Sequence, residues 1–438
     1  MSLATALLRF VVGMAASIMV ARLLGPEGKG EYALLVLVAA MLFNLGNLSI
    51  GNSIVYYVGG GKDRLEDIAA AALTAALALS VATMVSFVLL LAFLGQAILP
   101  GLTPWLLLAM AFLVPVRFVT FYYQQFMVAT HRVPQYSVTV VVGLLGYFSL
   151  LVMLLLIVPL GVVGAVVATA GGDVAALGAS LWLATRGVPW RLSFPGKLVW
   201  RFLVFGAKNH AAVLTSYLGY RLDMFLVNLF LGVLFVGYYS VGVGVAEMLL
   251  FLAASVEMVL LPRTSSLSWQ ESSRMVPVVA RNTIFLSALG AVGLLVLSPW
   301  LVPFLYGSVF APSVFPLLIL LPGIVLRGGD KILSVYIVGR GRPLICTLAA
   351  TANLVSNIGL NLFLIPRWGL GGAALASTVS YSVSFIIVLS IFLKMSRADL
   401  WQSIIIRGED FALYRRTSLQ IGSRLMAAAP WHVPEGTN

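Results

Sequence analysis

Cysteine, histidine and charge are all scarce in this sequence, and each shortage excludes a class of protein. The 438 residues include a single cysteine, Cys346, so neither an internal disulfide framework nor a cysteine-based metal cluster can form. The three histidines are too scattered for a familiar zinc motif, and we expect no metal site. Charged residues make up 10% of the chain, where about 25% is typical of globular domains, and hydrophobic residues make up 61%. A soluble protein needs charged side chains over its surface, so this composition predicts an integral membrane protein.

Long apolar runs predict that the fold is all-α. A spanning helix needs about 20 mostly apolar residues, and the runs show no period-two alternation of the kind that strands would give. The first run begins almost at Met1, is too long for a signal-peptide core and has no convincing cleavage site, so we interpret it as a retained helix. We predict twelve transmembrane helices, at 3–24, 31–58, 68–94, 104–128, 137–160, 162–185, 202–231, 235–262, 279–305, 316–338, 344–365 and 370–394.

The basic residues between these helices predict the orientation in the membrane. Alternate connections and the segment after residue 393 together hold 18 Lys and Arg, whereas the other connections hold only Arg22, Lys29 and Arg367. Because basic loops stay in the cytoplasm, we expect both termini to be cytoplasmic and the protein to lie in the plasma membrane. The net charge of +12 then follows from topology and anionic lipid, and nucleic acid is not expected as a partner.

The sequence contains an internal repeat. At an offset of 207 positions, 11 of the 26 residues in the window 20–45 are identical to their counterparts. A second match, at an offset of 208, pairs Gly164, Ala165 and Ala168 with Gly372, Ala373 and Ala376. Six helices in each half make the repeats parallel, as in transporters whose halves rock around a cleft. We therefore predict two pseudo-symmetric six-helix lobes, 1–200 and 201–394, around a central cavity, followed by a cytoplasmic tail, 395–438. The tail is either an amphipathic helix on the membrane surface or a partly ordered extension.

Eleven ionisable residues, six basic and five acidic, fall inside the predicted spans. Each costs about 2.5–3.5 kcal/mol at mid-membrane, so these groups should face a wet cavity or one another. Guanidinium groups stay charged and offer a fork of donors to phosphate oxygens, so a cavity lined by them suits a phosphate or diphosphate. We predict that the substrate-binding cations are Arg9, Arg117, Arg221, Arg327 and Lys331.

Spacing gives each of these cations a competing interpretation. Arg327 and Lys331 share one helical face with Asp330, which could pair with Arg327. Arg9 is close enough to the cytoplasmic end of its helix to reach the headgroups. Residues two apart point to different sides of a helix, so Arg221 should not pair with Asp223 and should remain free for an anionic ligand.

Acidic residues and prolines complete the predicted site. The acids serve either as sites for a coupling cation, H+ or Na+, or as counter-charges for neighbouring arginines: Asp173, Asp223, Glu247 and Glu257. Pro115 and Pro322, again 207 positions apart, lie inside their spans and are predicted hinges, although a proline in a spanning helix is often only a kink.

The segment 21–34, ARLLGPEGKGEYAL, resembles the signature of bacterial and archaeal polysaccharide flippases. Its counterpart at 230–241, the GRGRP turn at 339–343 and the segment 366–373 are similar to later parts of the same proteins. These belong to the O-antigen and capsule branch of the multidrug/oligosaccharidyl-lipid/polysaccharide exporter superfamily. The resemblance implies translocation of an isoprenoid-diphosphate-linked oligosaccharide to the outer leaflet by alternating access. Expected partners are this substrate, membrane lipids and other polysaccharide-assembly proteins.

Other functions fit the sequence less well. A polysaccharide polymerase or ligase would need a large external loop, and we find no nucleophile, metal pair or phosphate-binding loop, so neither an enzyme nor a cofactor is expected. A cation-coupled multidrug extruder would favour a predominantly acidic cavity. A lipid II flippase commonly has fourteen spans, and this chain has room for twelve. Both remain alternatives within the superfamily.

Overall fold

The chain folds into α-helices joined by short turns. The computed structural model describes residues 3–185 and 195–411, and within these ranges it contains no strand. The first half comprises α1 (Leu3–Gly46), α2 (Ile50–Gly60), α3 (Leu65–Ile98), α4 (Pro104–Ala111), α5 (Val114–Ala129), α6 (Val133–Val152), a π-helical turn (Met153–Ile157) and α7 (Gly161–Thr185). The second half comprises α8 (Gly196–Leu231), α9 (Val233–Glu247), α10 (Leu250–Ser266), α11 (Trp269–Tyr306), a 3₁₀ turn (Ser308–Ser313), α12 (Val314–Gly339), α13 (Pro343–Ser396) and α14 (Leu400–Ile404).

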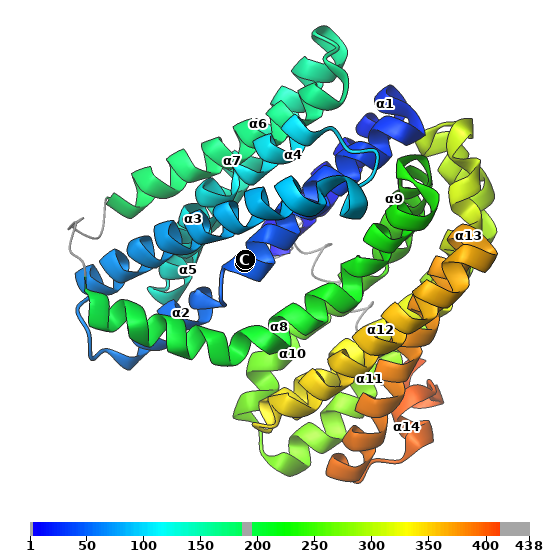
Figure 1. The fold of residues 1–438 in the computed structure, drawn as a ribbon. Helices are drawn as coiled ribbons and strands as arrows, with labels where there is room; N and C mark the ends of the chain where they lie inside the picture. The colour runs from blue at the N-terminus through cyan, green and yellow to red at the C-terminus, as the bar shows by residue number, and fades with distance from the viewer. Residues whose placement is uncertain (1–2, 186–194, 412–438) are drawn as a thin grey trace, which may run out of the picture.

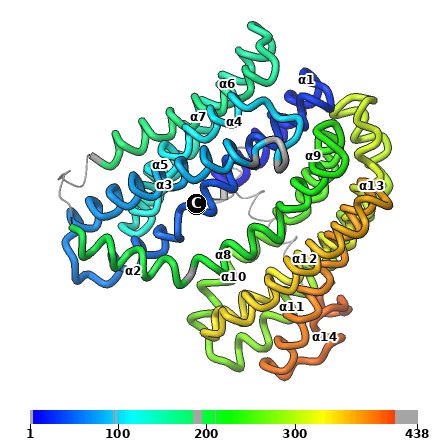
Figure 2. The backbone as a smooth tube through the Cα atoms, viewed as in Figure 1, coloured from blue at the N-terminus to red at the C-terminus, as the bar shows by residue number. Residues whose placement is uncertain are grey.

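The helices form two groups joined by α8. In Figure 1, α1–α7 lie together on one side and α9–α14 on the other, and the tube in Figure 2 follows α8 from the first group into the second. Glycines permit close approach at two points along α8. A side chain on Gly206 would overlap the carbonyl oxygen of Leu48, and one on Gly219 would lie 2.6 Å from the side chain of Asn353 on α13. One helix is therefore packed against both groups.

The protein is a multi-pass membrane protein. Among the described residues, eight helices are long and apolar enough to cross a membrane, or nine if α9 and α10 form one bent span. Two of the long helices fold back at a glycine with positive φ, Gly25 in α1 (68°) and Gly369 in α13 (54°). A left-handed backbone of this kind favours glycine because it lacks a Cβ.

Three runs that the sequence presented as single spans are interrupted, and one of these breaks, in the run 104–128, separates α4 from α5. The run 31–58 is interrupted between α1 and α2, where the Asn47 side chain accepts a bond from the Ser49 amide (2.7 Å) and donates to the Phe43 carbonyl (2.9 Å). Such side-chain bonds compete with the helical ladder. The run 235–262 bends by 46° after Glu247, where the amides of Met248 and Leu249 bond three residues back instead of four.

The two predicted hinge prolines differ in their effect. Pro115 lies in the first turn of α5, immediately after the break that separates it from α4. Pro322 lies inside α12, which continues through it. The Thr378 hydroxyl donates to the Ile319 carbonyl (2.7 Å), one turn before Pro322, as threonines in spanning helices do where a proline disturbs the ladder. Hinge motion at either proline stays a prediction.

The repeat is visible in the turns that follow the middle helices of each half. The amide of Arg132 bonds to the carbonyl of Met127 (2.8 Å), and the amide of Arg342 bonds to that of Ile337 (3.1 Å), 210 positions later. Each turn contains a residue with positive φ just before its arginine, His131 in the first half and Gly341 in the second. The same chain path therefore recurs in both halves.

The described part of the tail folds back on α11. The short helix α14 is capped by Asp399, and beyond it Asp410 forms a fork of two 2.7 Å bonds with Arg281, both side chains being buried. A single amphipathic helix is therefore wrong for residues up to 411. Residues 412–438 lie outside the described part of the chain.

Candidate substrate cavity

The first cavity, of about 550 Å³, lies among α1, α5, α6 and α7. Two predicted cations, Arg9 and Arg117, and one predicted acid, Asp173, line it. Neutral polar and aromatic groups complete its wall, among them Tyr32, Phe43, Thr120, Phe121, Gln124, Tyr136, Tyr147 and Thr169. The cavity is thus polar, aromatic and cationic within a bundle whose outer surface is apolar.

Arg117 does not stand alone in this cavity. Its Nε donates to the Asp173 carboxylate (2.7 Å), and the two side chains keep 18% and 26% of their surfaces exposed. Part of the Arg117 side chain therefore remains exposed beside a carboxylate that offsets its charge. Of the two roles predicted for Asp173, counter-charge fits this contact.

Tyr32 lies at the boundary between this cavity and a second one. Its hydroxyl is bonded to the Tyr147 hydroxyl (3.0 Å) and to the Thr169 hydroxyl (2.9 Å), which ties α1 to α6 and α7. Both tyrosines line the two cavities, together with Val36 and Ala40. The two spaces therefore share a wall along α1.

The second cavity, of about 490 Å³, lies between α1, α6 and α8. Its lining includes Lys29, Ser17, Tyr217 and Arg221, and no carboxylate is among the described residues that line it. It lies between the first group of helices and α8, the helix that joins the two groups. A site between groups of helices is a common position for ligands of membrane transporters.

Arg221 was predicted to lack a carboxylate partner, and this part of the prediction is wrong, whereas its role in substrate binding stays a prediction. Its guanidinium donates to Glu247 at the end of α9 (3.0 Å), a contact created by the way α8 and α9 pack. The sequence argument was correct that Asp223 faces elsewhere. The Asp223 carboxylate is buried and accepts bonds from the Tyr239 hydroxyl (2.7 Å), the Ser377 hydroxyl (3.1 Å) and the Met224 amide (2.8 Å).

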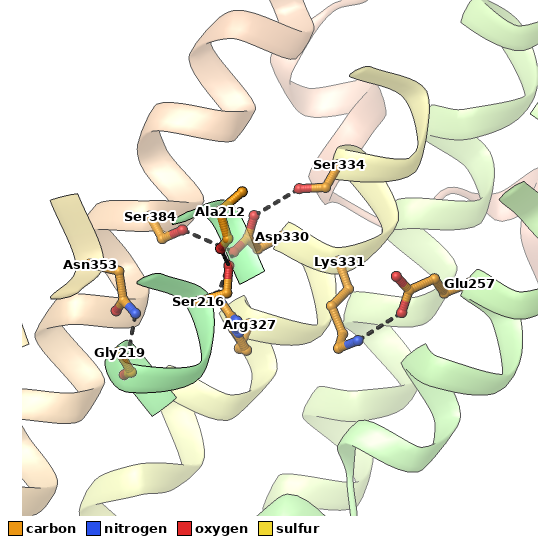
Figure 3. Close-up of polar contacts among 10 residues, drawn as sticks. All are labelled: Ala212, Ser216, Gly219, Glu257, Arg327, Asp330, Lys331, Ser334, Asn353 and Ser384. Atoms are coloured by element: carbon orange, nitrogen blue, oxygen red, sulfur yellow. Dashed lines mark hydrogen bonds and ion pairs between the residues drawn. The ribbon is translucent and has the colours of Figure 1, made fainter. Parts of the chain in front are cut away.

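The other two predicted cations lie in a polar cluster among α8, α10, α12 and α13. Arg327 donates to Asp330 (3.1 Å), and Lys331 pairs with Glu257 on α10 (2.7 Å), as Figure 3 shows. The Arg327 guanidinium also lies 4.5 Å from the ring centre of Tyr220 on α8.

The same cluster supplies Asp330 with further donors. Asp330 accepts bonds from Ser334 and Ser384 in addition to Arg327 (Figure 3). Neither Arg327 nor Lys331 lines the two cavities. A direct role for these two side chains in substrate binding stays a prediction.

Lys29 is the cavity residue that sequence reasoning missed. The count of basic residues between the predicted spans placed Lys29 in an external connection, yet only 7% of the residue is exposed. Its ammonium donates to the Ser17 hydroxyl (3.0 Å) across the fold-back at Gly25. The segment that carries it, residues 21–34, was recognised only for its resemblance to a family signature.

The described residues contain no cluster of three or more His, Cys, Asp or Glu that could hold a metal ion. What the two cavities can offer is charge, hydroxyl groups and aromatic faces. Such groups can hold an anionic, hydroxyl-rich ligand by hydrogen bonds and stacking.

Comparison with known families places these cavities in context. Residues 1–268 match the family model described as "Polysaccharide biosynthesis protein". The chain belongs to this family. The predicted resemblance to polysaccharide flippases is thereby confirmed. The polysaccharide biosynthesis protein family model covers every residue that lines either cavity.

A curated relative of this family member carries a more specific name. Over 170 residues the chain is 25% identical to the "Probable low-salt glycan biosynthesis flippase Agl15" of Haloferax volcanii. The match covers 38% of this chain and spans only 36% of the length of that protein.

Solved structures with the same fold are transporters. The lipid II flippase MurJ in an inward closed conformation has a TM-score of 0.74 at 15% identity, over 90% of this chain and 89% of that one. An inward-facing multidrug resistance MATE family transporter has a TM-score of 0.70 at 15% identity, over 91% and 97%. At 15% sequence identity, the similarity to these structures establishes only the fold of this polysaccharide biosynthesis protein.

Proposed function

We propose that this protein is a flippase that moves an isoprenoid-diphosphate-linked oligosaccharide from the cytoplasmic to the outer leaflet. The observation that carries the proposal is the first cavity, where Arg9 and Arg117 meet hydroxyl and aromatic groups inside an apolar bundle. A lipid-linked oligosaccharide needs these three environments together. Its tail suits lipid, its diphosphate suits guanidinium groups, and its sugars suit hydroxyl and aromatic side chains.

The ion pairs of the site are compatible with this role. Arg117 has one carboxylate partner and an accessible remainder, so a diphosphate can bind to its unused donors or displace Asp173. A binding site with a resident counter-charge avoids the cost of leaving a guanidinium uncompensated in the membrane between transport cycles.

The proposal includes the finer architecture. Dividing α1 at Gly25 and α13 at Gly369, and joining the second part of α1 to α2, α4 to α5 and α9 to α10, gives twelve spans in two six-helix lobes, 1–200 and 201–394. The tail, 395–438, and both termini would then be cytoplasmic, in the plasma membrane, as the distribution of basic residues favours. Alternating access would rock the lobes about the helix that joins them.

Asp223 is the best candidate for a coupling site for H+ or Na+. The residue is 4% exposed, and the partners it has among the described residues are neutral hydroxyl and amide groups. In the first half, the equivalents of its partners, Tyr32 and Thr169, bond to each other directly. A buried carboxylate added to this repeated framework, with no ion pair to a Lys or Arg among the described residues, is suited to take up a cation.

Two related functions are alternatives. A multidrug extruder of cationic compounds would need net negative charge at its site, whereas the cations lining the two cavities outnumber the single acid, Asp173. A lipid II flippase would share the diphosphate chemistry and differ in the sugar, so it remains the nearer alternative.

The test is transport in liposomes that contain the purified protein. The wild-type protein should move a fluorescent isoprenoid-diphosphate oligosaccharide across the bilayer. The R117Q variant should move it at a clearly lower rate. A cationic dye and lipid II serve as parallel substrates. Export of the dye without flipping of either diphosphate lipid would overturn the proposal in favour of the drug extruder.

A further inference from the structure

The second cavity contains a buried lysine that forms no ion pair with a carboxylate in the described part of the chain. Only 7% of the surface of Lys29 is exposed, and its hydrogen bond to the Ser17 hydroxyl is a contact with a neutral group. The cavity lining among the described residues holds two cationic side chains, Lys29 and Arg221, and no acidic one. Arg221 is already paired with Glu247, which leaves the ammonium of Lys29 as the uncompensated charge.

An uncompensated ammonium inside a membrane protein is costly. Removing a charge from water costs several kcal/mol unless a counter-ion or a set of hydrogen bonds replaces the lost hydration. One bond to a serine hydroxyl satisfies one of the three donors of the ammonium group. The cavity beside it has room for the missing partner, because its volume is about 490 Å³.

The position of Lys29 relates it to the first cavity. Arg9 and Arg117 line the first cavity, Lys29 lines the second, and the hydrogen-bonded hydroxyl groups of Tyr32 and Tyr147 lie in the wall between the two. Lys29 follows the fold-back of α1 at Gly25, whereas Arg9 lies near the start of the same helix. The two cationic groups therefore line neighbouring cavities that share a wall along α1.

We infer that Lys29 is the anion-binding residue of a second site, which receives the diphosphate group after it leaves the Arg9 and Arg117 chamber. This inference deepens the proposed function and rests on it. The ligand chemistry is a phosphate or diphosphate monoester, bound by the ammonium of Lys29 with help from the Ser17 hydroxyl and the accessible face of Arg221. Passage between the chambers requires the Tyr32 and Tyr147 side chains to separate.

The first experiment measures anion binding directly, in nanodiscs of neutral phosphatidylcholine. Inorganic pyrophosphate should bind K29Q about tenfold more weakly than wild type, or worse, because a charge-assisted hydrogen bond is lost. K29R should retain most of the affinity. K208Q is the matched control, since Lys208 lies exposed on α8 and its loss changes the net charge equally. Equal affinity of K29Q and wild type for pyrophosphate would overturn the inference.

A second experiment needs no variant and so does not depend on how K29Q folds. Reductive methylation of the wild-type protein, followed by peptide mass spectrometry, reports the reactivity of each lysine. Pyrophosphate should slow methylation of Lys29 and leave that of Lys208 unchanged. An unchanged rate at Lys29 would contradict the inference.

Further measurements distinguish a substrate diphosphate from a lipid headgroup as the bound anion. They also distinguish failure of the second site from failure of the flippase function. Farnesyl diphosphate should protect Lys29 at least as well as pyrophosphate; equal protection by phosphatidylglycerol alone would assign the site to a lipid headgroup and overturn the substrate role. If wild type flips the oligosaccharide lipid and K29Q does so at the same rate, the second site fails while the flippase stands. If wild type flips nothing, the flippase fails, and the pyrophosphate measurements still decide whether Lys29 binds anions.

Discussion

Gly30 on α1 and Gly237 on α9, 207 positions apart in the sequence, lie against each other where the two helices cross. A side chain on Gly30 would overlap the carbonyl oxygen of Val233, and one on Gly237 would overlap that of Pro26. Val233 and Pro26 are themselves 207 positions apart. The contact is therefore reciprocal, as expected where a two-fold pseudo-symmetry axis passes between the repeats.

This crossing predicts the effect of adding one methyl group. G30A and G237A should each destabilise the protein by about 1–3 kcal/mol, because the backbones can no longer approach as closely. Thermal unfolding in detergent measures the loss, and flipping rates in liposomes should fall with it. G244A, on the same helix as Gly237 and with open space at its Cα, should behave as wild type. Wild-type stability of both G30A and G237A would show that the helices do not pack this closely.

The Arg117–Asp173 pair allows a test that separates stability from transport. R117Q and D173N should each lower stability by about 1–3 kcal/mol, because each leaves a partly buried group without its partner. The double variant should recover part of that loss, as coupled residues do. Flipping should be slow in R117Q and in the double variant, and should persist in D173N, where the arginine keeps its charge. A double variant that flips at the wild-type rate would reduce this pair to a structural role.

Much of the fold could be predicted because composition and periodicity act locally. The scarcity of charge predicted membrane helices, and the 207-residue repeat aligned Gly30 with Gly237 before their contact was known. The break in the run 31–58 was missed for a specific reason. Hydropathy responds to the apolar side chains around Asn47, whereas the break depends on hydrogen bonds made by its amide group.

The site was harder to predict because it depends on which helices become neighbours. Spacing along one helix could tell that Arg221 and Asp223 point apart, but not that Glu247 would lie 3.0 Å from Arg221. Lys29 was missed because its burial arises from the fold-back of α1, which brings Ser17 to it from 12 residues away. In the linear sequence, a lysine that closely follows the Gly25–Pro26 pair is expected to lie in an exposed loop.

Asp223 predicts how transport responds to ion gradients. In D223N the amide oxygen can still accept from Tyr239 and Ser377, so stability should change little, while the charge that attracts a cation is gone. The flipping rate of D223N should therefore lose its dependence on an imposed Na+ gradient or pH gradient, whichever drives the wild-type protein. E409Q removes an exposed acid and should retain that dependence. An unchanged gradient response in D223N would exclude this carboxylate as the coupling site.

Asp410, in the tail, predicts a dependence of stability on pH. Burial acts to raise the pKa of its carboxyl, but the hydrogen bonds from Arg281, from the Arg407 amide and from Asn282 outweigh it and hold that pKa below the ordinary value. A lowered folded-state pKa means that the ionised carboxylate stabilises the fold fully above the unfolded pKa, which is about 3.9. That contribution is lost as the pH falls from there through the lower folded-state value.

The measurement is the unfolding temperature of wild type and D410N in detergent between about pH 3 and pH 7, a range that brackets the ordinary carboxyl pKa. At pH 7, D410N should unfold at a lower temperature than wild type, because the buried Arg281 loses its ionised partner and keeps only neutral acceptors, such as the Gln402 carbonyl. The difference should shrink toward the acid end, where wild type also loses its carboxylate. E409Q, which changes the exposed neighbour, should follow the wild-type curve throughout. A D410N deficit of the same size at every pH would mean that the tail is held by packing, such as the contact of Phe411 with Phe285, and not by this charge.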